Sequence, residues 1–224
     1  MKKSTLPMKK GLLISCLIMA SAYMSGCSQL IPKATELPSF YLLDGNKLAT
    51  QNESSSSKDQ AKATINKLAQ ATLVVNPSTA VAGFTSTRMV YSRVPYKLEY
   101  FAHSQWVDTP ARMLTPLVLN TLKANSLFST VTLSPNSAKS RYSLDTKIIR
   151  LQQDFFSPQS SERFTLLITL IDNTKHEVIL AREIDAVVTA KSDNPYGGVV
   201  AANGAVQVVL EQLAAQCNEV LNRK

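Results

Sequence analysis

The amino-acid sequence predicts an α+β fold in which an antiparallel β-sheet carries two amphipathic helices packed on one face, as a two-layer sandwich. Three observations lead to this prediction. Residues 142–151 and 163–171 alternate apolar and polar side chains, as half-buried strands do. A short turn at residues 172–175 favours antiparallel pairing of the strands that it joins. Residues 111–126 and 199–221 instead repeat apolar side chains at helical spacing.

The first 26 residues are typical of a cleaved bacterial signal peptide. Four lysines lie within residues 1–10, and an uncharged, mostly apolar stretch follows from Gly11 to Met24. This stretch is shorter than the roughly 20 apolar residues that a membrane span needs. The segment ends in Ser25-Gly26-Cys27, which resembles the lipobox of bacterial lipoproteins. We therefore expect Cys27 to become the first residue of the mature protein and to carry a diacylglycerol and an N-acyl chain such as palmitate.

The residues after Cys27 predict the location and the domain plan. In enterobacterial lipoproteins an Asp next to the lipidated cysteine tends to retain the protein in the inner membrane, so Ser28 favours the periplasmic face of the outer membrane. Residues 27–38 contain two prolines and are expected to form an extended, lipidated tether. Residues 39–224 are expected to fold as a single periplasmic domain, with the polar, Ser-rich stretch 46–70 as a flexible loop.

Composition excludes several classes of function. Removing the four leader lysines lowers the formal net charge from +8 to +4, and no basic block remains, so nucleic acid is not an expected partner. Cys217 is the one cysteine left once the leader is removed and Cys27 is acylated, so the domain is expected to have no internal disulfide. Cys217 lies on the apolar stripe of the last predicted helix, which favours a small buried side chain over a reactive thiol.

The remaining elements follow in chain order. Short apolar runs bounded by turn residues predict four strands before the first helix, at residues 40–43, 73–75, 89–91 and 97–101. Thr109 is a suitable N-cap and Pro110 suits the first helical position, where no amide bond is lost. After the turn at 172–175, residues 178–188 alternate as the second strand of a hairpin. Residues 194–198 are predicted to form a loop before the last helix. The expected buried stripe of that helix is Ala202, Val206, Leu210, Leu213, Cys217 and Val220.

No set of catalytic or cofactor-binding residues emerges from the spacing. His103 and His176 are the two histidines, and no cysteine pair accompanies them at metal-ligand spacing. Gly197-Gly198 lacks the Lys-Ser/Thr partner of a phosphate-binding loop, and the Gly-x-Ser-x-Gly pattern of serine hydrolases does not occur. We therefore expect neither an enzyme nor a bound metal, and no cofactor besides the covalent lipid on Cys27.

Four aromatic residues are candidates for contact with a partner: Trp106, Phe155, Phe156 and Tyr196. Phe155, Phe156 and Tyr196 are expected in loops, which carry binding more often than strands do, although ordinary, partly buried loop packing is the slightly favoured interpretation. Trp106 is favoured as a core anchor where the strand meets the first helix, with exposure to a partner or a lipid as the alternative.

The segment around Trp106 resembles a known family. Residues 100–110, Tyr-Phe-Ala-His-Ser-Gln-Trp-Val-Asp-Thr-Pro, run into the helix at 111–126, which is followed by Leu-Phe-Ser-Thr-Val at 127–131. Phe-Tyr-Leu-Leu at 40–43 follows the lipobox. This order is similar to that of the ABC-type transport auxiliary lipoproteins of the PqiC/YmbA-like kind.

The resemblance implies a lipid-anchored periplasmic accessory subunit of an MCE-type ABC transport system for phospholipids, which docks or stabilises the transport complex at the outer membrane. The implied partners are an MCE-domain periplasmic protein and its inner-membrane ABC transporter, with a homo-oligomer as a further implication. Two alternatives stay open. A regulator of a cell-wall synthase would need a longer tether than residues 27–38. An independent periplasmic lipid-binding carrier would need an apolar cavity between the sheet and the helices.

Overall fold

The computed structural model describes residues 37–44, 71–135 and 139–223. The predicted signal peptide, the lipidation site Cys27, most of the tether and the predicted flexible loop at 46–70 lie outside the described residues. Pro38–Lys224 forms one compact unit, and all the described strands and helices belong to it.

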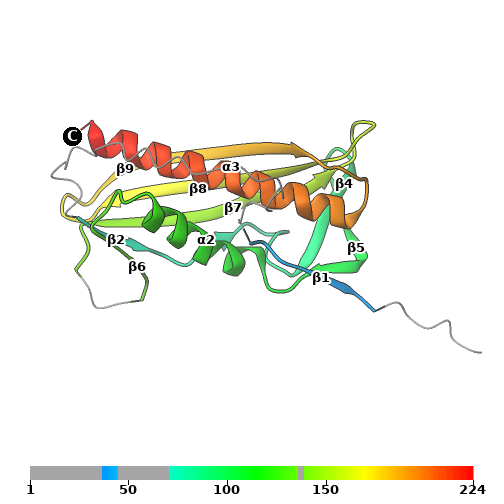
Figure 1. The fold of residues 1–224 in the computed structure, drawn as a ribbon, viewed down its shortest axis with the longest axis horizontal. Coiled ribbons are helices and arrows are strands. Elements are labelled where there is room, and N and C mark those ends of the chain that lie inside the picture. The colour runs from blue at the N-terminus through cyan, green and yellow to red at the C-terminus, as the bar shows by residue number, and fades with distance from the viewer. Residues whose placement is uncertain (1–36, 45–70, 136–138, 224) are drawn as a thin grey trace, which may run out of the picture. The chain divides into compact units, whose positions relative to one another are not determined.

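Within the described residues, nine strands form one sheet (Figure 1). In chain order they are β1 (Ser39–Tyr41), β2 (Thr72–Val75), β3 (Thr79–Ala80), β4 (Arg88–Val94), β5 (Lys97–Trp106), β6 (Thr130–Leu133), β7 (Tyr142–Asp154), β8 (Ser161–Asp172) and β9 (Glu177–Thr189). Hydrogen-bonded neighbours follow the order β1-β5-β4-β7-β2-β6, and β8 and β9 extend the sheet from the other edge of β7.

The central strand is β7. Along one of its edges, β2, β3 and β4 pair with it one after another, all in parallel. Along its other edge β8 runs antiparallel, and β9 runs antiparallel to β8. The α+β class is confirmed, but the expected purely antiparallel sheet is corrected to a mixed one. Parallel neighbours are joined by long crossovers rather than by short turns, so turn signals in the sequence do not report them.

Two helices cover the same face of this sheet, as expected (Figure 1). The helix α2 (Pro110–Ala124) packs against β3 and β6, and α3 (Pro195–Asn222) packs against β7, β8 and β9. The layer between them is filled by side chains with no exposed surface, among them Leu144, Ile148, Phe164, Leu166, Ile168, Val206, Val209 and Leu213. By length and composition α3 could span a membrane, but 61% of its most apolar stretch is buried inside the domain.

The beginning of α3 differs from the prediction of a loop at 194–198. The Asn194 side chain accepts a hydrogen bond of 2.8 Å from the Gly197 amide, and Pro195 occupies the first helical position. A Cβ atom at Gly197 would overlap the Ser192 carbonyl, and one at Gly198 would overlap the side-chain amide of Gln153. The two glycines therefore allow close packing at a helix N-terminus, which is a different role from that of a loop.

A buried asparagine joins β1 to α3. The Asn203 side chain accepts a hydrogen bond of 2.8 Å from the Asp44 amide and donates one of 3.1 Å to the Leu42 carbonyl. Val107, just after β5, donates its amide to the Tyr41 carbonyl at 2.9 Å. The backbone around β1 is thus fixed both to the helix and to the neighbouring strand.

Candidate partner-binding surface

The hairpin between β4 and β5 presents a tyrosine at its tip. Val94 pairs with Lys97, so Pro95 and Tyr96 form a two-residue turn. Tyr96 is fully exposed and its φ is 69°, in the left-handed region that is costly for residues with a Cβ atom. The Ser92 hydroxyl, at 2.9 Å from both the Val94 and the Lys97 carbonyls, holds the turn closed. The hairpin therefore keeps a large aromatic side chain in solvent at the expense of backbone strain.

Aromatic packing supports this hairpin from one side. The Tyr91 ring lies 4.5 Å from that of Phe101 and meets the Phe155 ring edge to face at 5.9 Å. The Arg93 guanidinium lies over both Tyr91 and Phe155, at 5.0 and 5.7 Å from the ring centres. The Phe155 amide also donates to the Ser92 carbonyl at 2.8 Å. The loop between β7 and β8 is thereby joined to the hairpin.

Hydrogen bonds join the same loop to the start of α3. The buried Gln153 side chain donates to the Ser160 hydroxyl at 2.8 Å and lies 3.4 Å from the Asn194 carbonyl. The Ser160 amide donates to the Asp193 carboxylate at 2.7 Å, and hydrogen bonds from the Ser160 amide and side chain lower the pKa of Asp193. The Gln159 side chain donates to the Ala190 carbonyl at 2.9 Å. Together these hydrogen bonds fix the loop in one arrangement, so the exposed side chains on this loop are pre-organised.

A cleft of about 510 Å³ opens beside the hairpin. Its apolar lining includes Tyr96, Leu98 and Phe156, and its charged lining includes Arg150 and Arg163. We call this region the hairpin cleft. Arg163 is paired with Asp154 at 3.5 Å and with Asp185 at 2.8 Å. Exposed aromatic and arginine side chains around a concave surface are the residue types that dominate the binding energy of protein interfaces.

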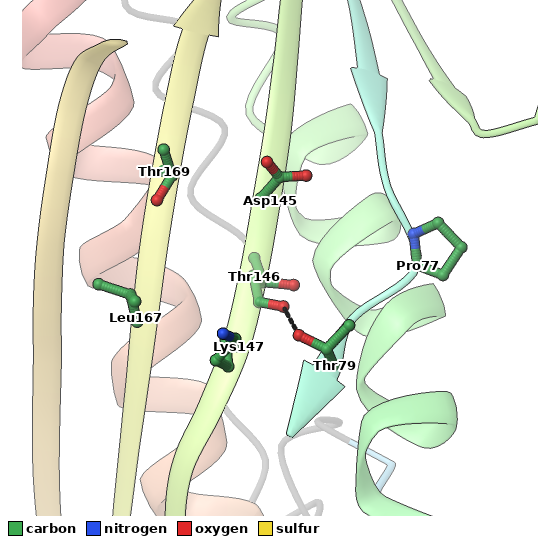
Figure 2. A pocket seen from close by; sticks show the side chains of 7 residues that line it. All are labelled: Pro77, Thr79, Asp145, Thr146, Lys147, Leu167 and Thr169. Carbon is green, nitrogen blue, oxygen red and sulfur yellow. Dashed lines mark hydrogen bonds between the residues drawn. The ribbon is translucent and has the colours of Figure 1, made fainter. Parts of the chain in front are cut away.

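A second cleft, of about 280 Å³, lies on the part of the sheet formed by β3, β7 and β8 (Figure 2). Its ionisable lining residues are Asp145 and Lys147, and Asp145 already accepts a hydrogen bond of 2.7 Å from Asn76. The Thr79 hydroxyl donates to the Thr146 carbonyl at 3.4 Å. The rest of its lining consists of threonines, Pro77 and Leu167, and no aromatic side chain lines this cleft.

The four predicted contact residues have different surroundings. Phe156 is 51% exposed and lines the hairpin cleft, whereas Phe155 is half-buried in the aromatic packing beneath the hairpin. Tyr196 is 62% exposed but packs elsewhere, with its ring 6.5 Å from that of Tyr41 on β1. Trp106 is 4% exposed, which confirms its favoured interpretation as a core anchor and contradicts the alternative of an exposed contact. Tyr96, the most exposed aromatic among the described residues, was not named because it falls between the strands predicted at 89–91 and 97–101.

Two buried ionisable groups do not line either cleft. Burial raises the pKa of Glu162 well above its usual value, and the nearby Asp154 carboxylate raises it further. Burial raises the pKa of the Cys217 thiol to about 12, which agrees with a buried, unreactive side chain. Within the part of the chain that the structure describes, no group of three or more His, Cys, Asp or Glu residues could hold a metal ion.

Comparison with known families identifies the fold. The model of the family described as ABC-type transport auxiliary lipoprotein component matches residues 55–216, which is more than half of the chain. The protein belongs to this family. The auxiliary lipoprotein also resembles two crystal structures, one of a DUF330-family protein from Xanthomonas campestris and one of an uncharacterized protein.

The two structural likenesses rest on shape rather than on sequence. The Xanthomonas campestris protein is 17% identical, with a TM-score of 0.63, over 69% of this chain and 87% of that one. The second protein is 10% identical, with a TM-score of 0.61, over 81% of this chain and 99% of that one. No curated protein matches the sequence. At these identities the structures show the fold alone, and the family shows an auxiliary role in ABC transport.

Proposed function

We propose that this auxiliary lipoprotein is a lipid-anchored periplasmic subunit of an MCE-type ABC system for lipid transport. In this proposal Cys27 carries the acyl chains in the outer membrane, and the domain docks or stabilises an MCE-domain protein that belongs to the inner-membrane transporter. The family supports the transport role. The partner, the outer-membrane location and the lipid on Cys27 are parts of the proposal.

The exposed, strained Tyr96 carries the proposal of a docking role. Its ring gains no burial in the isolated domain, and its positive φ lowers the stability of the fold. Phe156 is similarly exposed on a loop that hydrogen bonds fix in place. Side chains that are rigid, exposed and aromatic bind a partner at a small cost in conformational entropy. A protein partner that buries Tyr96 and Phe156 in the hairpin cleft therefore fits this geometry best.

The carrier alternative has less support. It needs an apolar cavity between the sheet and the helices, and side chains with no exposed surface, such as Ile148, Phe164 and Val209, fill that layer. A cell-wall synthase, the partner that the regulator alternative requires, would use the same hairpin cleft, so the experiment must distinguish the two partners.

The test is site-specific crosslinking in living cells. A benzophenone side chain replaces Tyr96 in the full-length protein, and a matched control carries it at Val178, which is exposed at the start of β9. After irradiation, the adducts are captured from native membranes and identified by mass spectrometry. The proposal expects an MCE-domain protein on the Tyr96 probe, with its ABC subunits co-purifying, and little of it on the Val178 probe.

Other outcomes of the crosslinking would contradict the proposal. Recovery of a cell-wall synthase on the Tyr96 probe, without an MCE-domain protein, would support the regulator. Equal adducts at Tyr96 and Val178 would show that the hairpin cleft is not the docking surface. Phospholipid extracted in fixed proportion from the purified protein, with no protein adduct, would support the carrier.

A further inference from the structure

An exposed apolar patch lies on β1 and the end of β5, away from the hairpin cleft. Phe40, Leu42 and Val107 are 60%, 52% and 51% exposed, and we call these three residues the β1 patch. In the parallel pairing of β1 with β5, Phe40 is opposite Gln105 and Tyr41 is opposite Trp106, which brings Leu42 next to Val107. Side chains alternate along a strand, so the patch points away from the core that contains Leu43 and Trp106.

The patch is rigid as well as exposed. The Asn203 side chain donates a hydrogen bond to the Leu42 carbonyl and accepts one from the Asp44 amide. The Val107 amide donates a hydrogen bond to the Tyr41 carbonyl. The three apolar side chains are therefore held at the surface by a fixed backbone. Exposed apolar side chains that form a contiguous group usually mark a site of contact with a protein or a membrane.

The position of the patch in the chain points to a lipid surface. Ser39, the first residue of β1, lies twelve positions after Cys27. A fully extended segment of that length reaches about 40 Å, so an anchor on Cys27 keeps the patch within that distance of the bilayer surface. The anchor holds the domain at the bilayer and so raises the effective concentration of the patch at the lipid surface. A small apolar patch is then sufficient for contact with the lipid.

We propose that the β1 patch inserts Phe40, Leu42 and Val107 into the interfacial region of the bilayer and so orients the anchored domain. The inference rests on the lipid anchor of the proposed function. From Val107, just after β5, the strand extends about 30 Å to the hairpin, at roughly 3.3 Å per residue. With the patch on the membrane, the opposite end of β5 carries Tyr96 and the hairpin cleft away from the bilayer, toward a partner in the periplasm.

The test measures contact with lipid at one position. Val107→Cys in the full-length acylated protein is labelled with an environment-sensitive fluorophore, and Val178→Cys is the matched control at a valine of similar exposure, 58% against 51%. Labelling is selective because Cys27 is acylated and Cys217 is buried with a pKa of about 12. The protein is placed in vesicles of phosphatidylethanolamine and phosphatidylcholine that contain a quencher attached to the acyl chains. We expect quenching at position 107 to exceed that at position 178 by about twofold or more, and Leu42→Ser to reduce it.

Each other result overturns the inference. Equal quenching at the two positions would show that the patch is not on the bilayer. A probe at 107 that is shielded but unquenched, in a protein that runs as an oligomer, would assign the patch to a second copy of this chain. Because the contact is apolar, quenching should persist at high salt, and its loss there would indicate electrostatic attraction instead.

The mass of the N-terminal peptide separates this inference from the proposed function. If Cys27 carries no acyl chain, the anchor of the proposed function is wrong, and sedimentation of the unacylated full chain with the same vesicles still tests the patch. Weaker sedimentation of Phe40→Ser than of Val178→Ser would then support the patch by itself, and equal sedimentation would refute it.

Discussion

At the scale of single residues, Tyr96 combines full exposure with a backbone conformation that lowers the stability of the fold. A residue with a Cβ atom in the left-handed region costs about 1–2 kcal/mol, and glycine avoids this cost while losing more entropy on folding. We therefore expect Tyr96→Gly to raise the free energy of unfolding by about 0.5–1 kcal/mol and to weaken partner capture by at least about tenfold. Denaturant unfolding and quantitative capture from membranes measure the two effects.

Tyr96→Ala is the matched control for the backbone. It removes the ring but keeps the Cβ atom at a φ of 69°, so it should lose the partner without the gain in stability. If Tyr96→Gly is instead less stable than Tyr96→Ala, the turn is not strained, and the argument from strain fails.

Glu162 is the second residue whose surroundings lower the stability of the fold. Burial and the Asp154 carboxylate raise its pKa, so the folded state holds a proton that the unfolded state has released. Stability should then fall as the pH rises from the ordinary pKa of a glutamate to the raised value in the fold. Glu162→Gln should remove this dependence and raise the free energy of unfolding at pH 7 by ~1 kcal/mol or more.

Unfolding at two pH values measures the effect of Glu162→Gln. At pH 4 the wild-type carboxyl is already protonated in the folded state, and the variant should match the wild type closely. If the variant raises the free energy of unfolding by the same amount at pH 4 and at pH 7, packing rather than the charge is responsible for the gain in stability. Asp185→Asn is a suitable control because that carboxylate is exposed and paired with Arg163.

At the scale of elements, the sequence predicted those whose signal is local. The hairpin of β8 and β9 was predicted because alternation and a turn occur together, and five of the six stripe residues predicted for α3 are buried. The strand β6 was missed because Thr130–Leu133 is only four residues long, too short for a periodic pattern to stand out. The first turn of α3 was missed because Pro195 and the two glycines were interpreted as loop residues.

The features that were not predicted depend on contacts between distant parts of the chain. The parallel pairing of β2 with β7 joins residues separated by the hairpin and α2, and nothing in the local sequence encodes it. The Asn203 contacts with β1 are equally remote. Of the candidate contact residues, Phe156 is exposed and lines the hairpin cleft, and Trp106 is buried, as its favoured interpretation as a core anchor predicted. Tyr96 was not named, because an aromatic side chain in a tight turn has no local mark of its exposure.

The two glycines of α3 allow an element-scale prediction. A Cβ atom at Gly198 would overlap the Gln153 amide, which is buried and bonded to Ser160. We expect Gly198→Ala to lower the free energy of unfolding by about 1–3 kcal/mol, since overpacking forces side chains from their preferred positions. The same change should weaken partner capture, because Gln153 holds the loop that carries Phe156. Thermal or denaturant unfolding and crosslinking measure these effects.

Gly204→Ala is the matched control within the same helix. Its Cβ atom would lie 3.6 Å from Val188, an ordinary contact, so this change should stabilise α3 by about 0.5–1 kcal/mol. If both variants are stabilised, Gln153 is free to move, and the loop is less firmly fixed than its hydrogen bonds indicate.

At the scale of the whole molecule, β5 separates two surfaces with different proposed tasks. The hairpin cleft at one end meets a protein, and the β1 patch at the other end meets lipid. Residues about 30 Å apart with no shared partner act independently, so their variants should combine additively. Phe156→Ser should reduce partner capture from detergent extracts and leave the quenching at position 107 unchanged. Leu42→Ser should do the reverse, because detergent removes the need for the bilayer contact. If either variant impairs both measurements to the same extent, while unfolding shows that its stability is intact, the two ends of β5 form one interface and the proposed division between protein and lipid is wrong.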